Sequence, residues 1–410
     1  MNDFARKFAV GAPIALLLAA SVSCSDDGIE SAQSSTTVSV PSDAASDAAS
    51  ESTAPSPDYG ARLHERIEQQ MAEDGTPGAV VLIRSEERGD WSAAFGTRQV
   101  GVDDPVTVDD VFRVGDVTAV MTATVLLRLH EQGKLSLSDP VSRYVDGVPG
   151  GDEITLRQLV DFEGGLIDYQ QVPEFQAAYA ADPQRVFDPQ ELLDLAFSAE
   201  ELPIDFEAWS RTNWIVLGLV IEEVTGKPAA DAFADELFEP LELEHIGLAD
   251  PSGSLPEPHA SGYVRGPDAF GGVVLPEAEQ PAGALEATDH TNDSASSAWT
   301  ASGAYATADD LATFFRAAVA GNLLSDETRA VWDEMDSLGY DQPDTVQFRF
   351  GLARDDGYLF YSGVTPGFNA VAAYNPDRDE TVVVLTNSMW TAGGNAPVAG
   401  IYETIRKALR

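Results

Sequence analysis

The sequence has little cysteine, little lysine and little positive charge. Cys24 is the only cysteine among 410 residues, so the chain has no C-x-x-C metal-binding motif. Acidic residues number 68 against 24 basic ones, and the formal net charge is -44. A surface of this charge repels phosphate backbones and anionic lipid headgroups, which excludes nucleic acid as a partner.

The N-terminus has the pattern of an export signal that ends at the lone cysteine. Arg6 and Lys7 precede an apolar run over 8–22 that is too short to span a bilayer comfortably. Small residues then lead to Cys24, and this arrangement resembles a bacterial lipoprotein signal, in which residues 1–23 are removed and the cysteine receives the lipid. An ordinary cleaved signal with an incidental cysteine is the alternative.

Residues 24–58 have the composition of a disordered tether. The segment holds ten serines after Cys24 and neither Lys nor Arg. Such a segment cannot bury enough apolar surface to offset chain entropy. The globular part is therefore expected over residues 59–410, a length that suffices for a large hydrophobic core.

Six segments of the globular part carry motifs in an order that is typical of one family. They are FRVGDVTAVMTA (112–123), RQLVDFEGGL (157–166), WSRTNWIVLGLVIEEVTGK (209–227), the segment 237–248, ASGAYATADDLATFF (301–315) and FYSGVTPGF (360–368). Together they resemble the serine β-lactamases and D-alanyl-D-alanine carboxypeptidases. The resemblance implies an α+β fold: an antiparallel sheet flanked by helices, with an inserted, mainly helical lobe and the active site at the junction.

Hydrophobic periodicity agrees with that architecture. It predicts helices at 61–73 and 398–409, with strands at 78–84, 91–96, 348–353, 358–361, 368–374 and 381–385. The middle of the chain is mostly helical in pattern, and strand-like runs return only near the C-terminus. Strands from both chain ends, with helices between them, fit the fold that the resemblance implies.

The resemblance also indicates which chemical groups this chain has replaced. The family reads roughly F-x-I-G-S-V-T-K, where the Ser attacks a carbonyl and the Lys one helical turn later takes its proton. Here Asp116 stands at the Ser position and Ala119 at the Lys position. Trp209 and Arg211 replace the Tyr and Asn of a Y-x-N motif, and Tyr361 replaces the His or Lys of the H-x-G or K-T-G motif.

No other residues supply the missing nucleophile and base. None of the four lysines follows a serine by three positions, and no G-x-S-x-G motif exists. Loss of one member of such a unit costs on the order of 10⁶ in kcat. We therefore predict no catalytic residue and no cofactor. His245, His259 and His290 lack metal-ligand spacing, so no metal site is predicted either.

The altered positions can still be interpreted as a ligand-binding surface formed by Asp116, Arg211, Trp209 and Tyr361. Asp116 is expected to cap the helix that begins near residue 117. Its carboxylate would then occupy the oxyanion hole that the helix N–H groups help to form in active relatives. Asp116 and Arg211 are expected within salt-bridge distance or one water molecule apart. Trp209, Trp214 and Tyr361 could form a platform for sugar rings, although core packing is the commoner role of such aromatic residues.

These observations predict a cell-envelope lipoprotein, anchored outside the cytoplasm through Cys24, that binds or scaffolds and does not catalyse. A cell-envelope protein or a peptidoglycan fragment is the expected partner. The alternative is an esterase or peptidase that uses Asp116 or Thr118 together with Tyr361. A carboxylate can act as a covalent nucleophile, which keeps this alternative open at the level of sequence.

The anchor is testable. We expect the mature protein to begin at a lipidated Cys24 and to partition into detergent, because the apolar run, the small residues and the lone cysteine occur together. Intact-mass spectrometry and detergent phase separation measure this. Cleavage at another residue, or a Cys24→Ala protein that stays bound to membranes, would contradict the expectation.

Overall fold

The computed structural model describes residues 57–199, 210–265, 287–321, 323–332, 336–337, 347–349, 351–391 and 393–409. The expected export signal, Cys24, almost all of the expected tether and Trp209 lie outside the described residues. Within those residues, no helix is long and apolar enough to cross a membrane.

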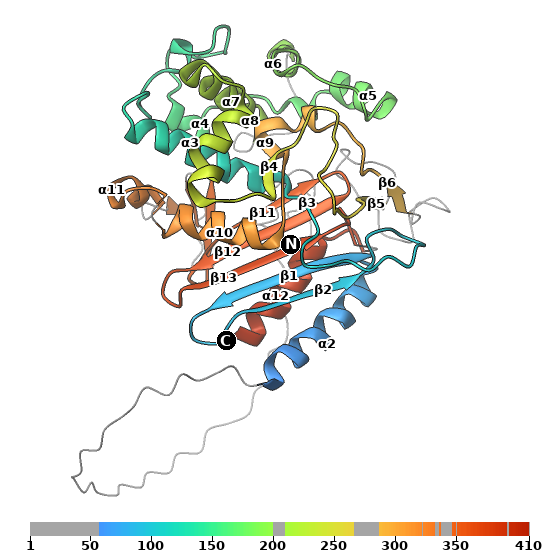
Figure 1. The fold of residues 1–410 in the computed structure, drawn as a ribbon. Coiled ribbons are helices and arrows are strands. Elements are labelled where there is room, and N and C mark those ends of the chain that lie inside the picture. The colour runs from blue at the N-terminus through green and yellow to red at the C-terminus, as the bar shows by residue number, and fades with distance from the viewer. Residues whose placement is uncertain are drawn as a thin grey trace, which may run out of the picture.

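The core of the fold is an eight-stranded antiparallel sheet that joins the two ends of the chain (Figure 1). Its order is β2-β1-β13-β12-β11-β10-β9-β8. The strands are β1 (Gly78–Ser85), β2 (Trp91–Gly96), β8 (Asp336–Ser337), β9 (Gln347–Arg349), β10 (Leu352–Asp355), β11 (Tyr358–Thr365), β12 (Phe368–Asn375) and β13 (Glu380–Thr386). Strands β1 and β13 pair from Ala79 opposite Thr386 to Ser85 opposite Glu380, so distant parts of the sequence meet in the sheet, one strand in from the edge strand β2.

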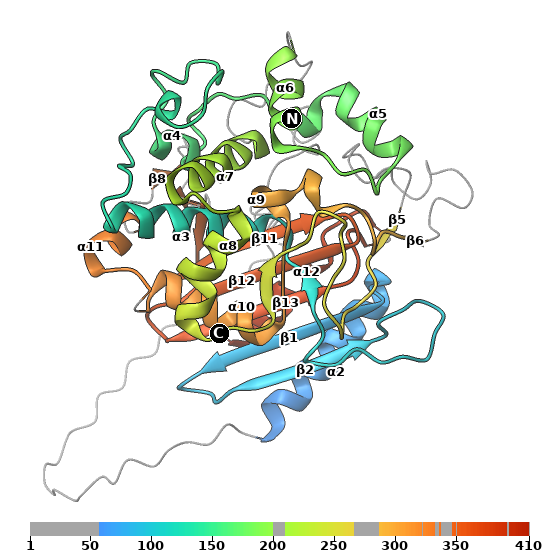
Figure 2. The same cartoon turned by 45° about the horizontal axis from the view of Figure 1, so that its top comes forward.

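Helices cover both faces of this sheet. Every residue of β12 and β13 is buried, which requires cover on each side. Helix α12 (Pro397–Leu409) packs on β12 and β13, and α2 (Pro57–Asp74) packs against α12 and β2 (Figures 1 and 2). Helix α10 (Ala308–Val319) packs on β1, β12 and β13. The wide apolar faces of these strands therefore become the hydrophobic core.

A mainly helical lobe lies above the α10 face of the sheet (Figure 2). Its helices are α3 (Thr118–Glu131), α4 (Leu156–Val160), α5 (Pro173–Ala181), α6 (Pro189–Ser198), α7 (Arg211–Thr225), α8 (Ala229–Phe233) and α9 (Trp299–Ser302), and α11 (Asp326–Arg329) follows α10. Single turns are η2 (Gly115–Val117), η3 (Val141–Arg143), η4 (Tyr169–Gln171), η5 (Ala234–Phe238), η6 (Glu239–Leu241), η8 (Ala295–Ser297) and η9 (Ala330–Trp332). Helix α7 begins where the Ser210 hydroxyl accepts the N–H of Thr212, and ends at Gly226 in the left-handed region.

The α+β prediction is confirmed, and two details of it are wrong. The expected strand at 348–353 is two antiparallel strands, β9 and β10, because the chain reverses before Gly351, whose φ is 77°. Strands also occur in the middle of the chain: β3 (Phe112–Arg113), β4 (Ile246–Leu248), β5 (Tyr263–Arg265), β6 (Ala287–Asp289) and β7 (Ala304–Ala306). Each has two or three residues, too few for an alternating pattern to mark them.

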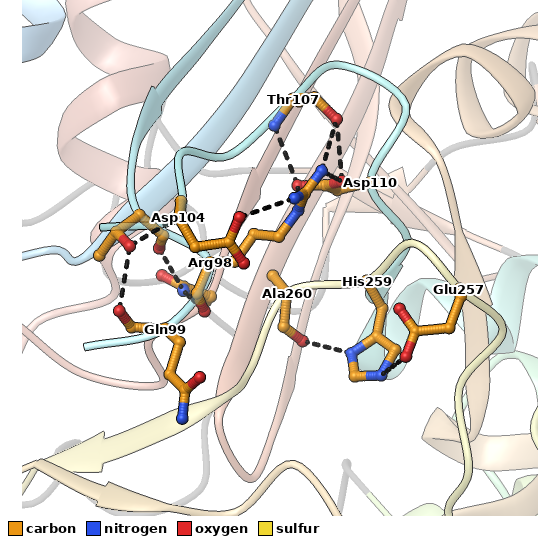
Figure 3. A network of polar contacts seen from close by, with 10 residues as sticks. Arg98, Gln99, Asp104, Thr107, Asp110, Glu257, His259 and Ala260 are labelled. Carbon is orange, nitrogen blue, oxygen red and sulfur yellow. Dashed lines mark hydrogen bonds and ion pairs between the residues drawn. The ribbon is translucent and has the colours of Figure 1, made fainter. Parts of the chain in front are cut away.

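The connection from β2 to β3 is fixed by one arginine (Figure 3). The Nε and Nη2 atoms of Arg98 each donate to the buried carboxylate of Asp110 at 2.8 Å, and Nη1 donates to Asp104 at 2.9 Å. Thr107 contributes its N–H and its hydroxyl to the same Asp110 carboxylate. This network holds two consecutive turns together immediately before the chain enters β3 and η2.

Two glycines let η2 lie directly against β11. Gly115 has a φ of 54°, and a Cβ there would stand 2.5 Å from the backbone nitrogen of Val364. A Cβ at Gly363 would stand 2.1 Å from the carbonyl oxygen of Val114 and 2.6 Å from the nitrogen of Asp116. Neither position can hold a larger residue without moving backbone. The contact places Asp116 next to the strand.

We expect Gly115→Ala to lower the free energy of unfolding by about 1–3 kcal/mol more than Gly133→Ala does, because only Gly115 faces another backbone. Gly133 is a matched control: its φ is 68°, and a Cβ there would meet nothing within 4 Å. Denaturant unfolding of the two variants measures the difference. Equal losses would mean that the close approach of η2 and β11 contributes nothing beyond backbone strain.

Candidate functional site

The carboxylate of Asp116 is the centre of the site. Its Oδ1 accepts Arg211 Nε at 3.1 Å and Ser302 Oγ at 2.6 Å. Its Oδ2 accepts Arg211 Nη2 at 3.3 Å and the backbone N–H of Val364 at 3.2 Å. An ionised carboxylate offers about four acceptor positions, so these four bonds use them all. The donors come from α7, α9 and β11, three elements that are far apart in the sequence.

Arg211 is the first residue of α7 and lies between two carboxylates. Besides its two bonds to Asp116, its Nη1 is 3.5 Å from Oδ2 of Asp168. The Arg211 side chain is 13% exposed, and those of Asp116 and Asp168 are 7% and 6% exposed. Burial disfavours the charged guanidinium, but the charges of Asp116 and Asp168 outweigh that effect and hold the pKa of Arg211 above its usual value.

Asp168 is the second carboxylate of this cluster. It precedes η4, where its Oδ1 accepts the N–H of Gln170 at 3.0 Å. Burial raises the pKa of Asp168 above its usual value and the Asp116 charge adds to this, while Arg211 acts in the opposite direction. Asp116, Asp168 and Arg211 together carry one negative charge when all are ionised.

The expected ion pair between Asp116 and Arg211 is confirmed, whereas the expected helix cap is wrong. The turn η2 precedes α3, and neither element has a side-chain cap at its N-terminus. The carboxylate of Asp116 is directed toward the guanidinium of Arg211, because a full positive charge attracts it more strongly than the partial charges of helix N–H groups. The N–H that it does accept belongs to Val364 on β11.

The other altered positions carry no group that could transfer a proton readily. Ala119 is buried in α3 and ends in a methyl group. Burial, and then the charge of Asp116, raises the pKa of Tyr361 well above its usual value, with Arg211 offsetting this only in part. Tyr361 therefore remains a neutral phenol at neutral pH.

Core packing, the commoner role expected for the three aromatic residues, is confirmed for two of them. Trp214 is fully buried and Tyr361 is 2% exposed, so both belong to the core. Trp214 contacts Phe162 edge to face, with ring centroids 5.7 Å apart. In the described ranges no group of three or more His, Cys, Asp or Glu side chains has the arrangement of a metal site.

The sequence analysis did not identify two side chains that contact the Asp116–Arg211 pair, those of Asp168 and Ser302. Ser302 lies inside the motif-bearing segment 301–315, and Asp168 follows the segment 157–166 by two residues. Their position next to recognised motifs was the available signal. Nothing in the local pattern indicates that either side chain meets Asp116 or Arg211, since these contacts span 186 and 43 positions.

Comparison with known proteins identifies the family. A family model described as Beta-lactamase matches residues 63–399, which is most of the chain and includes all six motif segments. The chain belongs to the beta-lactamase family.

Relatives within the family are distant. PbpX of Bacillus subtilis (strain 168), named as a penicillin-binding protein, is 24% identical over 328 residues, 79% of this chain and 74% of its own. A D-stereospecific amidohydrolase from Streptomyces sp. has a TM-score of 0.70 at 27% identity, over 84% of this chain and 97% of its own. The D-amino acid amidase of Ochrobactrum anthropi SV3 shares the fold, with a TM-score of 0.69 at 20% identity, over 86% and 100%.

We expect Arg211→Met to lower the free energy of unfolding by about 3–5 kcal/mol, because it leaves two buried carboxylates facing each other. Without Arg211 the pKa of Asp168 rises further above its unfolded value. The folded state then holds more protons than the unfolded state, so stability falls as the pH rises, and the deficit is larger at about pH 8 than at about pH 5.

Arg316→Met is the matched control for this change. Arg316 also forms a bidentate pair, with Asp379 at 2.8 and 2.6 Å, but its side chain is 48% exposed. Its loss should cost less than about 1 kcal/mol. Denaturant unfolding at the two pH values measures both variants. A deficit for Arg211→Met that equals the control, or that grows toward acid, would mean that the pair is not buried as described.

Proposed function

We propose that the protein is a lipid-anchored protein of the cell envelope whose beta-lactamase-related domain binds or scaffolds and does not turn substrate over. The observation that carries the proposal is the saturated carboxylate of Asp116, at the place of the family's nucleophile. All four of its acceptor positions are used by Arg211, Ser302 and Val364. A carboxylate in this state has no free lone pair aimed at a substrate carbonyl.

The second support is that the residues at the family's base positions are poor proton acceptors. The lysine position holds the methyl group of Ala119, and Trp209 offers an indole N–H, which only donates. Tyr361 is a phenol whose raised pKa makes it a poor base at neutral pH. Loss of the nucleophile and base unit costs about 8 kcal/mol of transition-state stabilisation, so acyl transfer by the family's mechanism is not expected.

The alternative enzyme, with Asp116 or Thr118 acting beside Tyr361, gains no support from the contacts. Thr118 is fully buried, its hydroxyl donates to the carbonyl oxygen of Gly115 at 2.6 Å, and it accepts the N–H of Ala304 at 3.0 Å. Both contacts hold α3 against its surroundings. The Thr118 oxygen is therefore committed to structure.

The relatives suggest a ligand class. One, a teichoic acid D-alanine hydrolase of Staphylococcus aureus (strain MRSA252), is 28% identical over 160 residues, 38% of this chain and 37% of its own. Its name and that of the D-amino acid amidase refer to D-amino acids, and PbpX is named for binding penicillin. We propose a peptidoglycan fragment or another cell-envelope protein as partner, reached from the anchor at Cys24.

The experiment is a joint test of labelling and turnover. We expect purified wild type to form no adduct with fluorescent penicillin by intact-mass spectrometry, and to hydrolyse neither a β-lactam nor a p-nitrophenyl ester above buffer. The double variant Asp116→Ser with Ala119→Lys should acylate weakly at most, because the positions of Trp209, Arg211 and Tyr361 remain altered. Asp379→Asn, at a carboxylate outside the site whose side chain is 28% exposed, is the control for changes unrelated to the site. Ester turnover by wild type that Asp116→Asn abolishes would establish the alternative enzyme.

A further inference from the structure

The groups around Asp116 form a complete receptor for a carboxylate. Arg211 approaches with two parallel N–H groups, the geometry that recognises carboxylates in bidentate fashion. Ser302 adds a hydroxyl and Val364 adds a backbone N–H, one on each oxygen. All four donors come from elements other than η2, which carries Asp116. The receptor is therefore formed by the rest of the protein, and Asp116 is what it holds.

We propose that Asp116 is a built-in ligand of an anion-binding site, and that this site binds small free carboxylates when the Asp116 carboxylate is removed. This inference rests on the proposed function, since a working Asp116 nucleophile would not be held as a ligand. In the native chain the same contacts close the site to external carboxylates. Asp116, Asp168 and Arg211 together carry one net negative charge, which also disfavours the binding of external carboxylates.

The size of the ligand follows from the atoms removed. Asp116→Ala deletes three non-hydrogen atoms, one carbon and two oxygens, and formate contains the same three. The surroundings are closely packed, with Asp116 5% exposed, so a larger anion has little room. Acetate should bind more weakly than formate, because its methyl group points at the new Cβ, and benzoate should not bind. A ligand of three non-hydrogen atoms reaches a dissociation constant on the order of millimolar at best.

The test is thermal unfolding and calorimetric titration of Asp116→Ala with sodium formate, against sodium chloride at equal ionic strength. We expect formate to raise the unfolding midpoint of Asp116→Ala in a saturable manner. It should leave wild type unchanged, because the receptor is occupied. Asp116→Asn is the matched control: the amide fills the same volume, so formate should have no effect there. An Asp116→Ala protein that responds alike to formate and to chloride would overturn the proposal.

Two further variants test the identity of the receptor. Asp116→Ala combined with Ser302→Ala should bind formate about tenfold more weakly, since one hydrogen bond to the anion is lost. Asp379→Ala removes a carboxylate from the similarly bidentate Arg316, whose side chain is 48% exposed. It should show no saturable response, because solvent can reach that arginine and hydrate it. An equal formate response in Asp116→Ala and Asp379→Ala would contradict a site specific to the cleft.

The readout remains decisive if Asp116→Ala unfolds without added anion. The titration then measures recovery of the folded state by circular dichroism, and failure to recover at about 100 mM formate, far above a millimolar dissociation constant, would overturn the inference. The hydrolysis assays are separate. Turnover by wild type would overturn the proposed function, whereas absence of formate binding would leave the inactive cleft in place and reject only the built-in ligand.

Discussion

The site depends on one buried ion pair, between Arg211 and Asp116. Transfer of both charges out of water is costly, and their attraction repays it only when hydrogen bonds satisfy the remaining acceptors. Ser302 and the N–H of Val364 supply those bonds, and Asp168 occupies the third side of the guanidinium. Formation of the pair therefore adds little net stability. Removal of either partner would nevertheless destabilise the fold strongly, because it would leave the other charge buried and unpaired.

That pair can form only because the backbone of the sheet and the helical lobe come unusually close. Gly115 and Gly363 remove the two Cβ atoms that would separate η2 from β11. Helix α7 brings Arg211 from the lobe, and α9 brings Ser302 from the segment before β7. The contact therefore joins the two parts of the fold at the place where the family's chemistry would occur. The framework of the fold here surrounds a carboxylate that is paired with a buried guanidinium.

The same geometry explains why the replacements at this site are mutually consistent. An aspartate in place of the serine would be a poorly compensated buried anion without Arg211, and Arg211 would be an unpaired buried cation without the two carboxylates. A lysine at position 119 would add a further charge to a closely packed interior, where Ala119 adds none. The site is therefore one electrostatic unit, and the substitutions in it cannot be understood singly.

Sequence alone determined the family, the α+β architecture, and the long strands and helices. These features reside in hydrophobic periodicity and in local motifs, which need only neighbouring residues. It also anticipated the pairing of Asp116 with Arg211, through the family's known arrangement of motifs. Tertiary structure alone decided that Asp116 is not a helix cap, that Trp214 and Tyr361 are core residues, and that Asp168, Ser302 and Val364 complete the site. Those outcomes depend on directions of side chains across 43 to 248 positions of sequence. A local pattern does not show which distant donor contacts a buried carboxylate. That contact is determined only when the sheet and the lobe pack together.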